Sequence, residues 1–487
     1  MIAWLDRLRS TESGKRVFEL YSPWLVIALA AFLRLVELAH PQRLVFDETY
    51  YVKDAWTLFN TGAERTWPAN FDAQFEAGSI NGYLSDPSYV VHPPLGKWII
   101  GLGMWLFGGE SAFSWRISTA VLGVASVALV FVLAKRILRS HAWALVAAFL
   151  MAIDGQAIVM SRVALLDGIL TFFVLLAFWF VLIDREKVLA ALDAGQALMW
   201  RRPWLYAAGI TLGAATAVKW SGLYFLAAYG LYVVGYEAIA RFRQAEDNGW
   251  ILKSVVQAVR DFVLLVPVAA ITYLASWSGW FISGTGYGAD KATNPLLALW
   301  LYHVDAYQFH VGLRTPHSYQ ANPLTWLFMQ RPTSMFYEGF GEGESGCGLP
   351  SGCSSAITAL PNPLIWLSAA AAILWIAYRW ILERRADQSM ILIGLVAGYV
   401  PWLVYLNRTV FQFYTVVFQG WMMIALAFAL RHWVVSRGPE RLQASRLKVG
   451  YFLTATAALS LFFLPIWIGT EIPYWFWSIH MWLPGWI

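Results

Sequence analysis

The stretch VALLDGILTFFVLLAFWFVLI, residues 163–183, decides the fold class of this chain. It carries one ionisable side chain, Asp167, among apolar and aromatic residues. An α-helix needs about 20 consecutive apolar residues to cross the hydrocarbon core of a bilayer. The stretch therefore predicts a transmembrane helix. Its one carboxylate is a candidate functional group, because charges at membrane depth are costly.

The rest of the chain also has the composition of a membrane protein. Of its 487 residues, 59% are hydrophobic and only 13% are charged, whereas soluble domains contain roughly 25% charged residues. The 28 Trp and 22 Tyr suit the interfacial belts of a bilayer. We expect an all-α polytopic membrane protein with about eleven transmembrane helices, near residues 22–39, 113–134, 142–160, 163–183, 204–220, 221–240, 262–281, 361–380, 389–406, 411–430 and 449–469.

Lys and Arg are distributed unevenly among the connections between these helices. If the N-terminus is cytoplasmic, every connection on the cytoplasmic side is basic, and most of the 35 Lys and Arg residues lie there. This is the positive-inside pattern of membrane proteins. It predicts an external C-terminus, and it explains the net charge of +5 without a nucleic-acid partner.

Two long segments are expected on the external side, residues 40–112 and 282–360, and loops of this length usually carry function. In the first, residues 96–108 are apolar but too few to span, so we expect a re-entrant or surface-lying helix. The second contains the only two cysteines, Cys347 and Cys353. A disulfide is the favoured interpretation on the oxidising side of a membrane, and a metal site is the alternative. We expect both segments to belong to one membrane-embedded domain that covers the whole chain.

Ionisable residues gather at the external ends of the predicted helices. Each has a simple structural explanation: a basic residue at a helix end usually extends to lipid headgroups, and neighbouring acids suit the first turn of a helix. Taken together, however, they occupy the side where the topology rule does not place Lys and Arg. A cleft with carboxylates for proton abstraction and cations for a phosphate would account for them. The candidates are Asp47, Glu48, His92, Lys97, Arg116, Arg162, Asp167 and Lys219, with Pro93 stiffening the chain beside His92.

A second group of candidates lies between residues 302 and 332. His303 and His310 are seven residues apart and would share one face of a helix. Zinc is one alternative there, but the spacing and the lack of a close Cys or Glu favour a surface for a sugar or a peptide. His317 and Tyr319 follow in the same segment.

Six motifs in this order resemble the protein O-mannosyltransferases, which are membrane glycosyltransferases of the GT-C type. The resemblance runs from about residue 30 to residue 430, and the acidic pair followed by HPPLGK is its specific part. The motifs are FDETYY (46–51), HPPLGKW (92–98), WRISTAVLG (115–123), SRVALLDGIL (161–170), AVKWSGL (217–223) and HSYQANPLTWLFMQRP (317–332).

Members of that family transfer mannose from a polyprenyl-phosphate carrier to Ser or Thr of secreted proteins, with inversion. The resemblance implies that Asp47 is the general base and that Glu48 supports it. It places Arg116 and Lys219 at the donor phosphate, with Lys97 and Arg162 as further phosphate ligands. The expected supporting residues are His92, Pro93, Asp167, His317 and Tyr319. We further expect nearby cations to hold down the pKa of Asp47.

One departure from the family pattern concerns the second external segment. Eukaryotic members carry a folded insert there, the MIR domain, for which residues 282–360 are too few. The chain therefore resembles a bacterial member, which implies a bacterial plasma membrane, an active site on the external (periplasmic) side and polyprenyl-phosphate-mannose as donor. Expected partners are this lipid-linked donor, Ser/Thr-containing secreted acceptor proteins and membrane lipids, with the secretion machinery as a further candidate. No cofactor is expected, and a divalent metal remains an open alternative.

Two other functions fit part of this sequence pattern. A GT-C transferase could move a lipid-linked sugar to a lipid or glycan acceptor and keep the same layout. A secondary transporter would also be polytopic with charges at membrane depth, but transporter sites lie near the midplane, often between repeated halves. Here the charges gather at one face, and no mirrored halves are visible in the sequence.

Overall fold

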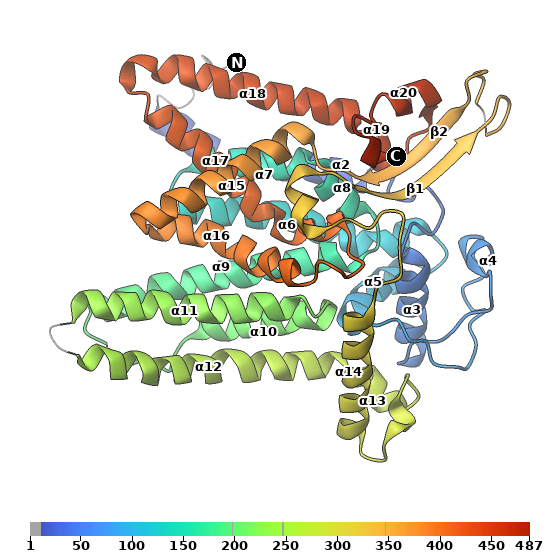
Figure 1. Ribbon diagram of the computed structural model, residues 1–487, viewed down its shortest axis with the longest axis horizontal. Coiled ribbons are helices and arrows are strands. Elements are labelled where there is room, and N and C mark those ends of the chain that lie inside the picture. Colours follow the sequence, from blue (N-terminus) through green and yellow to red (C-terminus); the bar gives the residue numbers. More distant parts are fainter. Residues whose placement is uncertain (1–10, 197, 246–247, 346) are drawn as a thin grey trace.

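A computed structural model of the chain describes residues 11–196, 198–245, 248–345 and 347–487. It is a bundle of long helices with smaller elements gathered at one end, on the right in Figure 1. Seven helices are long and apolar enough to cross a membrane: α2 (Glu12–Leu35), α6 (Ala112–Leu138), α9 (Leu166–Asp193), α11 (Gly222–Gln244), α12 (Gly249–Ser276), α15 (Pro363–Glu383) and α17 (Val416–Val435), the last together with the preceding turn.

The other apolar helices of the bundle are bent, short or less apolar. Helices α7 (His141–Ile153) and α8 (Gly155–Arg162) form a pair that bends by 59° at its break. Helices α10 (Pro203–Val218) and α16 (Ala386–Gly398) have fewer than 18 residues. Helix α18 (Leu442–Phe463) carries Arg446 and Lys448 and is not among the seven.

Each of the eleven expected spans therefore coincides with a helix or a broken helix of the described chain. Residues 163–183 lie almost entirely within α9, which is largely buried by its neighbours. By length and hydropathy alone, however, up to eight spans qualify. The polytopic helical fold is confirmed, whereas the count of eleven and the orientation of the termini stay predictions.

The break between α7 and α8 is held by two buried charges. Arg34 of α2 donates to the carbonyl oxygens of Met151 and Ala152, at the end of α7. Asp154 caps α8 by accepting from the N–H of Ala157. Backbone groups freed by a helix break must be satisfied inside a bilayer, and these two side chains satisfy part of them.

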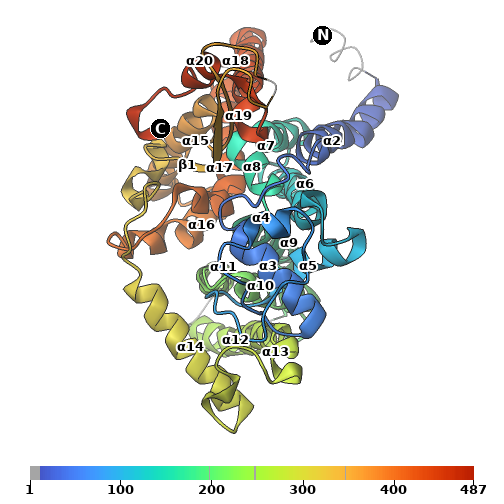
Figure 2. The same ribbon diagram turned by 90° about the vertical axis from the view of Figure 1, so that its right-hand side faces the viewer.

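Short helices cover the end of the bundle that carries the long loops. Helices α3 (Glu48–Thr61), α4 (Asp72–Glu76) and α5 (Leu95–Phe107) come from the first loop, and α5 coincides with the expected short apolar helix. Helix α14 (Pro295–Gly312) runs across the ends of α10, α11 and α12, as Figures 1 and 2 show. The remaining short elements are α13 (Ser278–Ser283), α19 (Pro465–Ile468), α20 (Tyr474–Ser478), η1 (Ala289–Lys291), η2 (Pro323–Phe328), η3 (Val400–Val404), η4 (Gln412–Thr415), η5 (Pro439–Arg441) and η6 (Pro484–Trp486).

The chain departs from an all-helical fold at one place. Strand β1 (Thr333–Phe340) pairs antiparallel with β2 (Cys353–Ala359), and β2 pairs with the two-residue strand β3 (Ile472–Pro473). A disulfide joins Cys347 to Cys353 at the hairpin tip. The indole N–H of Trp486 donates to the carbonyl oxygen of Met329, which ties the C-terminal segment to the chain just before β1.

Candidate active site

The acidic pair lies where the long loop after α2 enters α3. Phe46 adopts a left-handed backbone conformation, with φ of +54°, which is rare for a bulky residue and frequent near functional sites. Its ring packs edge-on against His317, Phe411 and Phe413, with ring centroids 5.7–6.0 Å away. These contacts fix the turn that presents Asp47.

Glu48 is completely buried and its carboxylate is fully occupied. It receives two hydrogen bonds from Arg116, from Nε at 2.8 Å and from Nη2 at 2.9 Å. The backbone N–H groups of Val45 and Ala164 donate to the same carboxylate at 2.8 and 2.7 Å. Glu48 therefore joins the loop that carries the acidic pair to α6 and to the start of α9. Neither of its carboxylate oxygens is free to act as a base.

The carboxylate of Asp47 is in the opposite situation. It is half-buried and makes no hydrogen bond or ion pair with any residue that the structure describes, and it does not cap α3. Burial raises the pKa of Asp47 to about 6; Lys219 lowers it and Asp167 raises it further. The expectation that cations hold this pKa down was wrong, because desolvation outweighs Lys219. A pKa near 6 still leaves most of the group ionised at neutral pH, and it suits a general base.

Lys219 lies in the turn between α10 and α11, beside Asp47. Its ammonium is 2.9 Å from both carboxylate oxygens of Asp167, in the first turn of α9. It also lies 3.9 Å from the ring centroid of Tyr414. The ion pair fixes the position of the ammonium, whose field reaches the Asp47 carboxylate.

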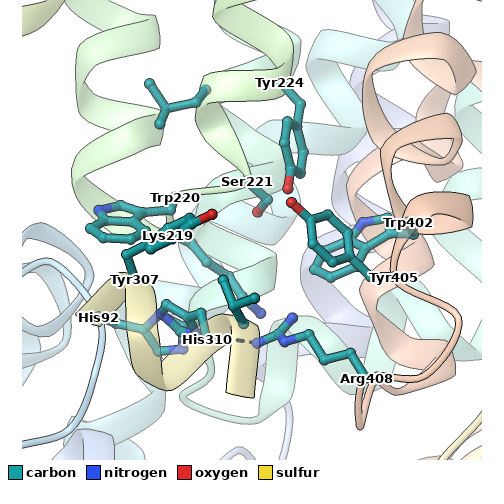
Figure 3. A pocket seen from close by; sticks show the side chains of 12 residues that line it. His92, Lys219, Trp220, Ser221, Tyr224, Tyr307, His310, Trp402, Tyr405 and Arg408 are labelled. Atoms are coloured by element: carbon teal, nitrogen blue, oxygen red, sulfur yellow. Dashed lines mark hydrogen bonds between the residues drawn. The ribbon is translucent and has the colours of Figure 1, made fainter. Parts of the chain in front are cut away.

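Lys219 also lines a pocket of about 220 Å³. Figure 3 shows Lys219, His92, His310 and Arg408 around it, together with several aromatic rings. Its rim includes the exposed apolar side chain of Leu223 and the exposed ring of Tyr307. The full lining is His92, Lys219, Trp220, Ser221, Leu223, Tyr224, Tyr307, His310, Val311, Trp402, Tyr405 and Arg408.

Two nitrogen atoms of these lining residues lack a hydrogen-bond partner among the described residues. They are Nδ1 of His92 and Nε of Arg408, and both are buried. Buried polar atoms are nearly always satisfied in native proteins, so these two indicate where a polar ligand group would bind. Arg408 Nη2 donates to His310 Nδ1 at 3.2 Å, and His310 donates from Nε2 to the carbonyl oxygen of Val91 at 2.9 Å. Burial lowers the pKa of His92 well below its usual value and that of His310 to about 4, so both rings are neutral at pH 7.

Three of the cations expected at the donor phosphate are engaged by protein groups. Arg116 bonds to Glu48 and to the carbonyl oxygens of Leu38, Pro41 and Arg43, so every N–H of its guanidinium has a partner. Arg162 caps the end of α2 through the carbonyl oxygens of Leu33, Val36 and Glu37. Lys97 is fully buried and bridges Asp54, which is also buried, and Glu64, which is partly buried. The phosphate role of these residues stays a prediction, and the geometry favours Lys219 and Arg408 for it.

The expected supporting residues lie at two places around the site. His92 lines the pocket, and its ring lies 6.0 Å from the ring of Tyr51 in α3. Pro93, the next residue, is buried and is not part of the pocket lining. His317 packs on Phe46, and Tyr319 stacks under the guanidinium of Arg331, which donates to the carbonyl oxygen of Ser318.

His303 and His310 share α14, as their spacing predicted. His303, however, bonds to Tyr273 and to the carbonyl oxygen of Leu299 through its two ring nitrogens. The contacts of these two histidines therefore indicate hydrogen bonding as their role. Among the described residues, the one grouping with metal-ligand geometry is Cys347, Cys353 and Glu471, and its two sulfur atoms form the disulfide.

Arg408 is the residue that the sequence reasoning missed. It lies in the short connection between the expected spans 389–406 and 411–430. That connection is external in the predicted topology. Arg408 is therefore a basic residue on the side where few are expected, which is the same pattern that made Arg116 a candidate. The aromatic residues around Arg408 gave no comparable signal, because the whole chain is rich in Trp and Tyr.

Comparisons with known proteins point to one family. The sequence model of the family described as dolichyl-phosphate-mannose-protein mannosyltransferase matches residues 24–278. The polyprenol-phosphate-mannose–protein mannosyltransferase of Mycolicibacterium smegmatis is 32% identical, over 95% of this chain and 92% of its own length. The protein of the same name from Corynebacterium glutamicum is 29% identical, over 95% of this chain and 93% of its own.

Solved structures share the fold. The S. cerevisiae protein O-mannosyltransferase Pmt1-Pmt2 complex bound to the sugar donor aligns with a TM-score of 0.73 at 16% identity, over 100% of this chain and 94% of that chain. ArnT from Cupriavidus metallidurans bound to undecaprenyl phosphate aligns with a TM-score of 0.55 at 17% identity, over 91% and 64% of the two chains. Both are membrane glycosyltransferases of the GT-C type, and at these identities the likeness concerns the fold alone.

Proposed function

This chain belongs to the dolichyl-phosphate-mannose-protein mannosyltransferase family, and from this premise we propose that it transfers mannose from polyprenyl-phosphate-mannose to Ser or Thr hydroxyls of secreted proteins. The donor is the one named for its bacterial relatives. The observation that carries the proposal is the unpaired carboxylate of Asp47 beside a pocket whose cations are Lys219 and Arg408.

Asp47 is the general base of the proposed reaction. The acceptor hydroxyl is a poor nucleophile until its proton is removed. As the hydroxyl oxygen bonds to the anomeric carbon of mannose, its proton passes to the Asp47 carboxylate. The bond between the anomeric carbon and the phosphate oxygen breaks, and the electron pair leaves with the lipid phosphate. One displacement inverts the anomeric carbon and needs a single base, by analogy with inverting glycosidases.

Lys219 and Arg408 stabilise the leaving phosphate. Negative charge grows on the departing oxygen, and preorganised cations stabilise it most in a site from which water is excluded. Asp167 holds the Lys219 ammonium in place, and His310 holds the Arg408 guanidinium. The unpartnered His92 nitrogen offers a further contact to a phosphate oxygen or a sugar hydroxyl.

The reaction takes place at the external face of a bacterial plasma membrane in this proposal. The site lies at the end of the bundle that carries the two long loops (Figure 2), opposite the ends rich in Lys and Arg. Leu223 and Tyr307 at the rim suit a lipid carrier whose chain remains in the bilayer. Acceptors would reach this face during secretion, so contact with the secretion machinery stays a prediction.

The test uses the purified full chain, radiolabelled polyprenyl-phosphate-mannose and a Ser/Thr-rich peptide. Wild type should label the peptide, and Asp47→Asn should lose at least a hundredfold in rate. Asp86→Asn is the matched control, because Asp86 is an exposed acid of the same loop and its variant should keep the wild-type rate. Label that reaches a lipid or a glycan and no peptide would replace the proposed acceptor. Full activity of Asp47→Asn would remove the proposed base.

A further inference from the structure

The outer edge of strand β1 is unpaired. Along its whole length β1 pairs with β2 on one side. Apart from this ladder, no backbone–backbone hydrogen bond joins residues 333–340 to any other described part of the chain, and the carbonyl oxygen of Phe336 accepts one long bond of 3.5 Å from the hydroxyl of Ser334. Thr333 and Met335 are buried, whereas residues 336–340 are half-buried or exposed, so the accessible part of this edge is about five residues long.

An exposed strand edge is a liability, because any extended chain can pair with it. Proteins usually protect such edges with Lys, Pro or very short strands. The sequence of β1 is TSMFYEGF; it contains neither Lys nor Pro, and its one charge is Glu338. A bulge interrupts the ladder between Ser334 and Phe336 and leaves the outer half regular. This edge therefore has the properties of a pairing surface.

The strand begins at the rim of the candidate active site. Arg331, two residues before β1, donates to the carbonyl oxygen of Ser318 at 2.8–2.9 Å. His317, the residue before Ser318, packs on Phe46, which precedes the proposed base Asp47. From this start β1 runs outward to the disulfide-closed tip.

The free edge of β1 also faces the loop that carries Asp47 and leads into α3. In Figure 1, β1 is the strand on the side of α3 and α4, while β2 and α20 lie on the other side. Glu338 acts electrostatically on Arg43, four residues before Asp47. The carbonyl oxygen of Arg43 accepts from Arg116, the partner of Glu48. An extended chain on this edge would thus lie beside the loop that carries Asp47.

We propose that the free edge of β1 binds the acceptor polypeptide as an added strand, and this inference rests on the proposed function. Strand addition recognises main-chain N–H and C=O groups and tolerates many side chains, as a transferase acting on many secreted proteins requires. Antiparallel pairing is the more stable arrangement, and β1 runs away from the site. The added strand would therefore run toward the site, with its paired residues on the N-terminal side of the acceptor Ser or Thr.

The spacing gives a register. Residues 333–335 separate the rim from the accessible edge and cover about 10 Å at roughly 3.4 Å per residue. The paired part of the peptide should therefore begin about three residues before the acceptor and extend over about five residues. Alternate residues of that part direct their N–H groups to β1.

The experiment is a backbone N-methylation scan of a peptide with one acceptor Ser and ten preceding residues, using the full chain and radiolabelled polyprenyl-phosphate-mannose. A methyl group removes one N–H donor and leaves the side chain unchanged. The expected result is a three- to tenfold rise in peptide KM at every second position, about three to seven residues before the Ser, with kcat unchanged. The same scan on the C-terminal side should give no alternation.

Two enzyme variants complete the test. Glu338→Pro and Gly339→Pro each remove one backbone N–H of β1. Because these residues are neighbours in a strand, one of the two N–H groups points to β2 and the other to the free edge. The variant that loses the N–H directed at β2 should have a lower melting temperature. The variant that loses the N–H at the free edge should keep the melting temperature and lose the preference for the extended peptide over a four-residue peptide. Transfer to both peptides without alternation, or equal behaviour of the two variants, would overturn strand addition and leave the proposed function standing. No transfer to either peptide would overturn both.

Discussion

The substitution Glu48→Ala separates the two neighbouring acids of the site. Glu48 is fully buried and bonds twice to Arg116, which is itself 1% exposed. Removing one partner of a buried ion pair leaves an uncompensated charge and typically costs about 3–5 kcal/mol of stability. The N–H groups of Val45 and Ala164 lose their acceptor as well. We expect the melting temperature to fall by roughly 5–10 °C, at about 2 °C per kcal/mol for a large chain.

The assay is thermal unfolding of the purified protein, followed by Trp fluorescence. Asp47→Ala is the comparison, because its carboxylate has no partner among the described residues. That variant should melt within about 2 °C of wild type although it loses activity. The double variant Glu48→Ala/Arg116→Met removes both charges and should regain a large part of the stability. If Glu48→Ala melted like wild type, or if the double variant were less stable by the sum of the two single losses, the ion pair would not organise this loop.

Three further predictions concern the chemistry of the site. Because protonated Asp47 cannot accept a proton and its pKa is raised to about 6, kcat/KM should fall about tenfold per pH unit below pH 6; a profile flat down to pH 4.5 would contradict Asp47 as the base. Arg408→Gln should raise the KM for the lipid donor roughly 10- to 100-fold by removing a charged hydrogen bond, and Arg408→Lys should lie between it and wild type because Lys lacks the planar fork; equal kinetics of all three proteins would exclude a role at the donor. Phe46→Leu should lower kcat about tenfold at unchanged donor KM, since the edge-on contacts that fix the catalytic turn are lost; a change in KM alone would place Phe46 at the donor instead.

The sequence predicted the fold because its signals are strong in a membrane protein. Long apolar stretches such as residues 163–183 have few alternatives to a transmembrane helix. The short stretch 96–108 forms helix α5, as expected, and its re-entrant or surface-lying position stays a prediction. The hairpin of β1 and β2 was not predicted. The third strand of its sheet comes from a segment more than a hundred residues later in the chain, and no local pattern indicates such a partner.

The site was predicted less evenly, since residue type does not indicate which partners a side chain has in the fold. Asp47 and Glu48 are adjacent acids in the sequence, yet one carboxylate is saturated with hydrogen bonds and the other has none. Likewise Arg116 and Lys219 both lie at helix ends that the sequence predicts to be external, but every N–H of Arg116 is engaged by protein groups, whereas Lys219 lines a pocket. The raised pKa of Asp47 also depends on burial, which no sequence pattern specifies.

The junction between the hairpin and the C-terminal segment bears on the biogenesis of the enzyme. Strand β2 pairs with Ile472 and Pro473, and Trp486 bonds to the backbone at Met329, just before β1. During synthesis, residues 329–359 emerge long before these partners, and in the predicted topology they lie on the outer side of the membrane. The sheet can therefore be completed only after α15, α16, α17 and α18 have been synthesised. The nascent chain would thus form the loop that carries Asp47 early and the neighbouring sheet last. Maturation of this enzyme would therefore be complete only at the end of translation.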